Sequence, residues 1–142
     1  MEARYAEIQD AATRATNLDS SADEFVRWAL ALARVESDGE EVPPSDKGRA
    51  RGVWRMHPPF FDEFRAPAQL GETWLEWDAC ALWRFWCSAV RDLGLHPVHV
   101  GMLFHVGAGA YKSGEWDTEY AARLQTALIW VPGVLTPAGT RG

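Results

Sequence analysis

The chain has 142 residues, of which 47% are hydrophobic, and its formal net charge at pH 7 is −6. This length suits one domain with a sizeable core, and the eight tryptophans argue for a folded rather than a disordered chain. The acidic balance excludes a general nucleic-acid binder, which would carry a basic face. The sequence has no apolar run of about eighteen residues, so we expect no membrane insertion.

Two features bear on the compartment of the chain. Residues 1–7, MEARYAE, lack the basic and then apolar plan of a secretory signal. We therefore expect synthesis in the cytoplasm, and any action outside the cell needs another route out. Cys80 and Cys87 are expected on one helix, separated by about 10.5 Å of rise, which is too far for a disulfide. Both are interpreted as reduced core residues.

Hydrophobic periodicity predicts helices in the first third of the chain. A first helix is expected over residues 3–17. A stronger one begins at residues 21–24, SADE, which form a capping-box pattern, and residues 37–39, SDG, end it. One apolar stripe at helical spacing supports this second helix: Phe25, Trp28, Ala29, Leu32 and Val35.

The middle of the chain changes character over residues 40–56. Proline and glycine are frequent there, which predicts turns and short strands rather than a helix. A helical turn or two is expected over residues 60–64. The most apolar helix is predicted over residues 73–93, and we expect it to be the central, buried helix, with Gly94 just past its end.

Further helices are predicted in the last third of the chain. Pro97 begins one that runs through Phe104, and residues 107–110, GAGA, form a Gly-rich break. Asp117 or Thr118 caps a last helix that runs to residues 132–133, and the final residues are expected to form a loose tail. The predicted fold is one mainly α domain over residues 1–142 with a core from about 20 to 132. It has five or six helices and one small β-hairpin after the second helix.

Glu36 is the strongest candidate for a chemical role. It lies eleven positions after Phe25, about 20° away on the helical wheel, and therefore falls on the apolar stripe. It also ends its helix, where the macrodipole disfavours a negative charge. Both effects raise a carboxyl pKa, and a protonated carboxylic acid is what general-acid cleavage of a glycosidic bond needs. The alternative is one of the many solvated, inert glutamates at helix ends.

The sequence around Glu36 resembles goose-type lysozymes and soluble lytic transglycosylases of the lysozyme-like superfamily. Residues 35–39, VESDG, resemble the family's Glu-Ser-x-Gly motif, and residues 45–58, SDKGRARGVWRMHP, resemble its Gly-rich hairpin. Residues 102–111, MLFHVGAGAY, stand where the family has an Ala-Tyr-Asn-x-Gly segment. Residues 118–123, TEYAAR, resemble the closing helix, which carries a tyrosine near the catalytic acid. The four segments occur in the family's order.

The resemblance implies a lysozyme-like fold and a peptidoglycan-degrading muramidase without a cofactor. Such an enzyme cleaves the β-1,4 bond between N-acetylmuramic acid and N-acetylglucosamine, and Glu36 would be the general acid. Two positions depart from the family, since Arg55 replaces a glutamine and His105 replaces an asparagine, and neither side chain is an amide. Either the glycan is bound differently or part of the site is lost. The substrate-binding candidates are Ser45, Gly52, Trp54, Arg55, His57, His105 and Tyr120.

Asp46 is the candidate second carboxylate. An inverting hydrolase would hold it roughly 6.5–9.5 Å from Glu36 with a water between them, whereas a lytic transglycosylase needs no such partner. In a transglycosylase the substrate's own hydroxyl attacks. An aspartate here equally suits a turn in which it bonds its own backbone. Gly48 and Gly52 also have two interpretations. Glycine allows the backbone to approach a sugar closely, and it equally suits an ordinary turn.

The tryptophans and histidines complete the candidates. Four tryptophans lie on apolar helical stripes and are interpreted as core: Trp28, Trp77, Trp83 and Trp86. Two others are better candidates for a sugar-stacking groove wall: Trp54 and Trp116. No carboxylate or cysteine completes a ligand set with the three histidines of the C-terminal half, so no metal site is predicted: His96, His99 and His105.

Two functions follow from these observations. The first is an enzyme acting on peptidoglycan glycan strands in a bacteriophage or prophage setting, released through a holin or carried as a virion component. The second is a lysozyme-like module retained for binding or assembly with phage tail or particle proteins, with catalysis weakened at Arg55 and His105. A shared fold does not guarantee a shared activity.

Overall fold

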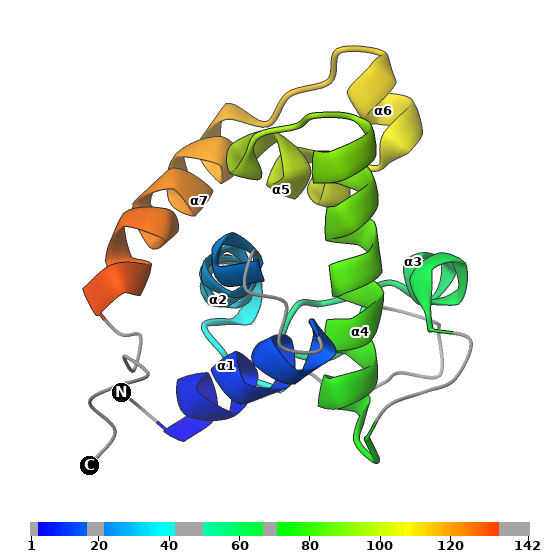
Figure 1. Ribbon diagram of the computed structural model, residues 1–142. Helices are drawn as coiled ribbons and strands as arrows, with labels where there is room; N and C mark the ends of the chain where they lie inside the picture. The colour runs from blue at the N-terminus through cyan, green and yellow to red at the C-terminus, as the bar shows by residue number, and fades with distance from the viewer. Residues whose placement is uncertain (1–2, 17–21, 42–49, 67–70, 134–142) are drawn as a thin grey trace.

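The computed structural model describes residues 3–16, 22–41, 50–66 and 71–133. The described chain is mainly helical, as predicted, and has more helices than expected (Figure 1). The described residues form seven α-helices: α1 (Ala3–Ala15), α2 (Asp23–Ser37), α3 (Pro58–Phe64), α4 (Trp74–Cys87), α5 (Pro97–Val106), α6 (Ala108–Lys112) and α7 (Thr118–Trp130). A π-helical turn, η2 (Ser88–Asp92), continues α4, and a 3-10 turn, η3 (Val131–Gly133), continues α7.

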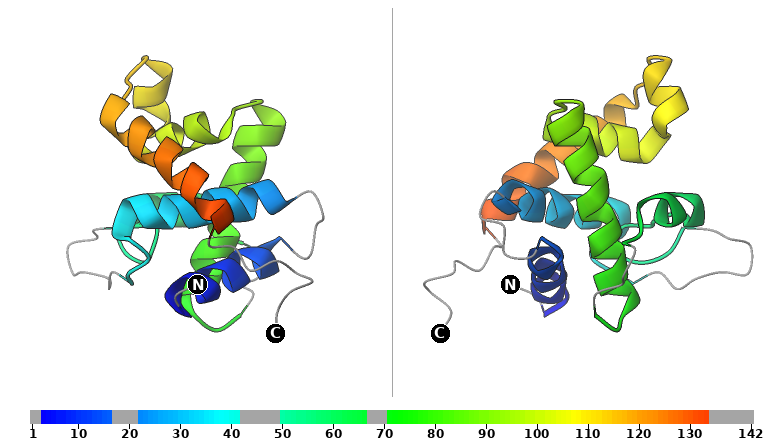
Figure 2. Two further views of the ribbon diagram at one scale, coloured as in Figure 1. Left: turned by 90° about the vertical axis from the view of Figure 1, so that its left-hand side faces the viewer. Right: turned by 45° about the vertical axis from the view of Figure 1, so that its right-hand side comes forward.

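The central helix is α2. Figure 1 looks nearly along its axis and shows α1, α4, α5 and α7 around it. Both views of Figure 2 show α7 lying across α2, and the two helices are in contact. All residues from Trp28 to Ala33 are buried, because the apolar sequence WALALA covers every side of this part of the helix. The prediction that the helix over 73–93 is the central one is therefore wrong: Trp77 and Trp83 on α4 are only half-buried.

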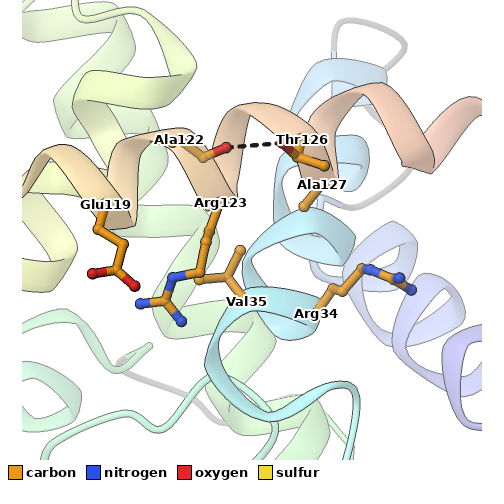
Figure 3. A pocket seen from close by; sticks show the side chains of 7 residues that line it. All are labelled: Arg34, Val35, Glu119, Ala122, Arg123, Thr126 and Ala127. Carbon is orange, nitrogen blue, oxygen red and sulfur yellow. Dashed lines mark hydrogen bonds between the residues drawn. The ribbon is translucent and has the colours of Figure 1, made fainter.

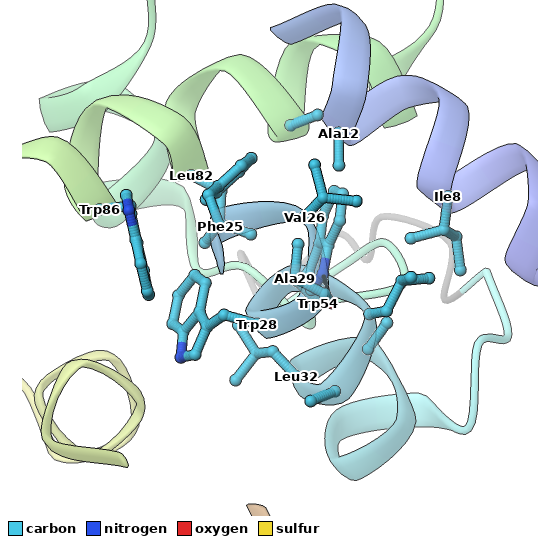
Figure 4. Packing of buried hydrophobic residues seen from close by; sticks show 14 of the residues in the cluster. Ile8, Ala12, Phe25, Val26, Trp28, Ala29, Leu32, Trp54, Leu82 and Trp86 are labelled. Carbon is cyan, nitrogen blue, oxygen red and sulfur yellow. Dashed lines mark hydrogen bonds between the residues drawn. The ribbon is translucent and has the colours of Figure 1, made fainter. Parts of the chain in front are cut away.

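Aromatic side chains of α2 and α4 fill the core (Figure 4). The rings of Trp28 and Trp86 have centroids 5.0 Å apart, and those of Phe25 and Trp86 are 6.0 Å apart. Helix α1 adds Ile8 and Ala12, both buried, so the core begins well before residue 20. Cys80 and Cys87 form no disulfide, as predicted; Cys80 is buried and Cys87 is half-buried.

The segment after α2 contains a turn where the β-hairpin was expected. Arg51 and Met56 form one isolated antiparallel bridge, with N–O distances of 3.1 and 2.8 Å, and the described residues contain no strand. Gly52 and Arg55 both have positive φ, +77° and +49°, and a bond of 3.1 Å from Arg55 N to Gly52 O closes the loop. Pro58 begins α3 two residues after the bridge, so the pairing cannot extend on that side. The predicted hairpin is therefore wrong for this part of the chain.

The helix ends agree with most of the predicted signals. Asp117 caps α7, because its side chain accepts a bond from Tyr120 N, and Gly94 ends the α4–η2 helix with φ of +68°. The Gly-rich break is shorter than predicted: only Gly107, with φ of +90°, interrupts the helices, and α6 follows at once. Ala22 precedes α2 without a side-chain cap bond, and Ser21 of the predicted capping box lies outside the described residues, as does the tail after residue 133. No described helix is long and apolar enough to cross a membrane.

Candidate functional site

The last turn of α2 is held in a fixed conformation. Asp38 adopts the left-handed conformation, and its amide donates to Arg34 O at 3.1 Å, while the Gly39 amide donates to Ala33 O at 3.2 Å. These bonds satisfy the last carbonyls of the helix. The hydroxyl of Tyr5 on α1 donates to Asp38 Oδ1 at 2.8 Å. The backbone that carries Glu36 is thus braced on the side of α1.

Glu36 and Tyr120 join α2 to α7. The Tyr120 hydroxyl donates to Glu36 Oε2 at 2.6 Å, and the tyrosine is 2% exposed. Tyr120 lies in the first turn of α7, where its own amide donates to Asp117 Oδ1 at 3.0 Å. The cap that begins α7 therefore also fixes the backbone of the residue that holds Glu36.

His105 covers the ring of Tyr120. The two rings are parallel within 3°, with centroids 3.8 Å apart. His105 Nε2 lies 2.9 Å from Asp117 Oδ2. Hydrogen bonds from the Tyr120 amide and from His105 lower the pKa of Asp117, which keeps this carboxylate ionised. An ionised carboxylate only accepts, so Nε2 of His105 is the protonated, donating nitrogen.

The electrostatics of Glu36 combine two opposed effects. Burial raises the pKa of its carboxyl, because the charged form loses its hydration. The bond from Tyr120 lowers that pKa, as do the charges of His105, Arg55 and Arg123, but burial dominates and the net shift is upward. The C-terminal end of α2 disfavours the anion further. The pKa of the Tyr120 hydroxyl lies well above its usual value, because the group is buried and faces Glu36.

The turn after α2 brings Arg55 to this site. Ser37, next to Glu36 in the chain, donates from Oγ to the carbonyl of Val53 at 2.6 Å. That bond fastens the turn directly to the last residue of α2. Arg55 is exposed, and its charge lies near enough to act on the Glu36 pKa. Arg55 therefore lies within electrostatic range of the candidate acid.

A buried ion pair fastens the same turn to α4. Arg51 Nη1 lies 3.0 Å from Asp78 Oδ1, and the Arg51 guanidinium stacks 4.1 Å from the ring centroid of Trp74 and 4.7 Å from that of Phe61. Burial raises the pKa of Asp78 to about 7, although the charge of Arg51 opposes the shift. A Cβ on Gly52 would lie 2.7 Å from Asp78 Oδ2. Both this contact and its positive φ account for glycine at that position without any sugar.

The structure thus brings together four of the residues that the sequence singled out: Glu36, Arg55, His105 and Tyr120. Trp54 does not join them. Its side chain is fully buried and donates from Nε1 to Ala29 O at 2.8 Å, so the prediction that it forms a groove wall is wrong.

Of the remaining candidates, two belong to the described residues and three do not. His57 is exposed and immediately precedes α3. Trp116 packs against His99, with ring centroids 4.8 Å apart. Because 42% of Trp116 is exposed, its ring remains accessible to a ligand. Three candidates lie outside the described residues: Ser45, Asp46 and Gly48.

Three members of the site were missed by sequence reasoning. Ser37 was part of a quoted motif, but its bond to the turn depends on tertiary structure. Asp117 was identified as a cap, and its second bond, to His105, has no sequence signal. Arg123 had one available signal, because it lies one helical turn after Tyr120 and therefore on the same face of α7.

The described side chains contain no group of three histidine, cysteine, aspartate or glutamate residues that could hold a metal ion. The site instead offers a largely buried carboxyl, a phenol donor, two arginine side chains and a histidine. No family model, curated protein or solved structure matches the chain.

Proposed function

We propose that the chain is a peptidoglycan-degrading muramidase with a lysozyme-like helical fold, in which Glu36 is the general acid. The single observation that carries the proposal is the environment of Glu36. Its pKa is raised by burial at the end of α2, while Tyr120 holds one of its carboxyl oxygens at 2.6 Å. A positioned acid of this kind suits cleavage of the β-1,4 bond between N-acetylmuramic acid and N-acetylglucosamine.

The contacts give each side chain a role in the proton transfer. Because Tyr120 donates to Oε2, Oε1 of Glu36 is left to carry the proton to the leaving oxygen. Once the proton has left, the Tyr120 hydroxyl and the charges of Arg55, His105 and Arg123 stabilise the carboxylate. Burial thus favours the protonated acid before the step, and its neighbours moderate the cost of the anion after it.

The second half of the reaction has two forms. A water positioned by Asp46 would give hydrolysis, and attack by the muramic acid's own hydroxyl would give a 1,6-anhydro product. We favour hydrolysis, because Asp46 follows Glu36 by ten residues in the segment that leads to the Arg55 turn.

The alternative is a catalytically weakened lysozyme-like module that binds glycan or supports a phage particle. The observation in its favour is that Arg55 and His105, which replace two amides of the family, both act on the Glu36 site. The phage setting, with holin release or a place in the virion next to tail or particle proteins, rests on the sequence resemblance alone.

The decisive experiment compares the wild type with Glu36→Gln on peptidoglycan, by zymogram and by release of soluble fragments. Removing a positioned general acid costs about 10²–10⁴-fold in rate, so the variant should fold normally and lose nearly all activity. Glu40→Gln is the matched control, because Glu40 is an exposed glutamate just past the same helix. Equal lysis by wild type and Glu36→Gln would remove the proposal. Folded wild type inactive on several wall types would favour the binding module.

A further inference from the structure

A groove lies between α7 and the last turns of α2, beside the Glu36 site (Figure 3). Its volume is about 400 Å³, within the range of ligand pockets. Small side chains leave the surface of α7 accessible along it. The lining residues are Arg34, Val35, Glu119, Ala122, Arg123, Thr126 and Ala127.

Two arginines reach this groove from different helices. Figure 3 shows Arg34 of α2 and Arg123 of α7 with Val35 between them. Both are exposed, and within the described chain neither forms an ion pair. Arg34 stacks over Trp130, 4.1 Å from its ring centroid, which supports the guanidinium plane and leaves its edges free to donate. Two exposed arginines that form no ion pair with a described residue are notable in a chain whose net charge is −6.

The groove adjoins the candidate acid at one end. Val35 precedes Glu36 in α2, and Arg123 lies one turn after Tyr120 in α7. The charge of Arg123 acts on the Glu36 pKa, so the two groups are near each other. A substrate whose scissile bond lies at Glu36 would therefore project its substituents toward Arg123 and then Arg34.

The charge pattern selects the class of substituent. A guanidinium matches a carboxylate with two parallel N–H bonds, and two guanidinium groups suit two separate carboxylates. Glu119 lines the groove near the Tyr120 end, so the lining has a net charge of only +1. That negative neighbour disfavours a compact polyanion such as a phosphate chain and suits a ligand with isolated carboxylates and an amino group.

We propose that this groove binds the stem peptide that muramic acid carries through its lactyl group, with Arg34 and Arg123 holding the peptide's carboxylates. The inference rests on the proposed muramidase function and adds to it that the enzyme recognises peptide-bearing glycan rather than bare glycan. Peptide carboxylates lie several bonds from the sugar, which fits two arginines that line the groove beside the acid, Arg123 on α7 and Arg34 on α2. The groove therefore makes the peptide part of the specificity of the enzyme.

A binding experiment tests the groove without any catalysis. The probe is a free stem tripeptide, alanyl-γ-glutamyl-diaminopimelate, titrated into the protein and followed by NMR shifts. Arg34→Gln and Arg123→Gln should each weaken binding about tenfold, equivalent to about 1.4 kcal/mol. Arg27→Gln is the matched control, because Arg27 is an exposed arginine of α2 that does not line the groove, and it should bind as wild type does. The tripeptide with its carboxylates converted to amides should bind weakly to all variants.

A kinetic experiment identifies the source of the carboxylate. Arg34→Gln should raise KM about tenfold for peptide-bearing glycan and leave kcat unchanged, with little effect on glycan stripped of its peptides by an amidase. An equal rise on stripped glycan, which keeps the lactyl carboxylate, would overturn the peptide assignment.

The two experiments separate this inference from the function on which it rests. Glycan cleavage that is indifferent to both arginines would refute the groove and leave the muramidase standing. Arginine-dependent peptide binding by a protein that cleaves no glycan would support the groove and refute the muramidase. Equal binding of the tripeptide and its amide, no binding of either, or equal weakening by Arg27→Gln would each refute the groove.

Discussion

The hydroxyl of Tyr120 donates a hydrogen bond to Glu36 Oε2 at 2.6 Å, although the two residues lie 84 positions apart in the chain. The bond closes the contact between α7 and the end of α2. It opposes the effect of burial on Glu36, because a hydrogen bond to the carboxylate favours the ionised form. The proton affinity of the candidate acid therefore depends on both helices.

Replacing Tyr120 by phenylalanine should raise the pKa of Glu36 further. The variant keeps a ring for His105 to stack on and loses only the donor to the carboxylate. A bond to a charged group is worth about 1.5 kcal/mol or more, which corresponds to a shift of roughly one pH unit. Because a general acid works in its protonated form, the limb on which activity falls with rising pH should move upward by that amount.

The measurement is the pH profile of kcat, together with an NMR titration of the Glu36 carboxyl that needs no activity. Tyr111→Phe is the control, since Tyr111 bonds to His99 instead of Glu36 and its loss should leave the titration unchanged. A downward shift in Tyr120→Phe would contradict the role given to the hydroxyl.

Asp78 should make the protein less stable as pH rises from about 4 to about 7. Its pKa is raised to about 7 in the folded chain, against about 4 in the unfolded chain, so the folded state binds more protons over that range. The free energy of unfolding is then highest below the unfolded pKa and falls as the pH approaches the folded one. One such group contributes a slope of up to about 1.4 kcal/mol per pH unit.

Urea denaturation at several pH values measures that slope in wild type and in Asp78→Asn. In Asp78→Asn, most of the dependence of the unfolding free energy on pH should be lost. Some slope should remain, because burial also raises the pKa values of Glu36 and Glu41 and these act in the same direction. An unchanged slope in Asp78→Asn would show that Asp78 does not titrate in this range.

Trp54→Ala should destabilise the fold strongly. The side chain is fully buried and its indole N–H is bonded to Ala29 O, so truncation leaves a cavity and removes a buried hydrogen bond. We expect a loss of about 3–5 kcal/mol in the free energy of unfolding. Trp116→Ala, at an exposed tryptophan, should change it by less than about 0.5 kcal/mol. Similar losses in both variants would contradict the assignment of Trp54 to the core.

Asp46→Asn separates the two forms of the proposed reaction. If Asp46 positions a water, turnover should fall strongly, and wild-type products should carry ordinary reducing-end muramic acid. If the substrate's own hydroxyl attacks, the products are 1,6-anhydro sugars and the substitution has little effect. Mass spectrometry distinguishes the two by the mass of one water. Products that are entirely anhydro would refute hydrolysis and leave Glu36 as the candidate acid.

Local signals in the sequence were sufficient for most helices. Periodicity, the Asp117 cap and Gly94 each act over a few residues, so they survive in any tertiary setting. The choice of central helix failed because burial depends on neighbours: α4 is more apolar overall, but α2 is the helix that α1, α4 and α7 contact. The hairpin prediction was wrong over the described residues, because the pairing stops at the single Arg51–Met56 bridge before Pro58 begins α3.

In the candidate site, too, local features were predictable and features that depend on tertiary contacts were not. The position of Glu36 on an apolar stripe at a helix end was readable locally, and burial does raise its pKa. The pairing of His105 with Asp117 and the bond from Ser37 to the Val53 carbonyl join segments that are distant in the chain. Neither bond leaves a spacing pattern, so neither was predictable from one sequence.

The bond from Tyr5 to Asp38 limits how far the chain can be shortened at its N-terminus. Glu36 and every group that acts on its charge lie beyond residue 35, yet the turn that ends α2 is braced by a residue of α1. A fragment that began at residue 20 would keep all of those groups and lose the Tyr5 bond, together with the α1 side chains packed in the core. The smallest fragment with an intact site therefore starts upstream of Tyr5.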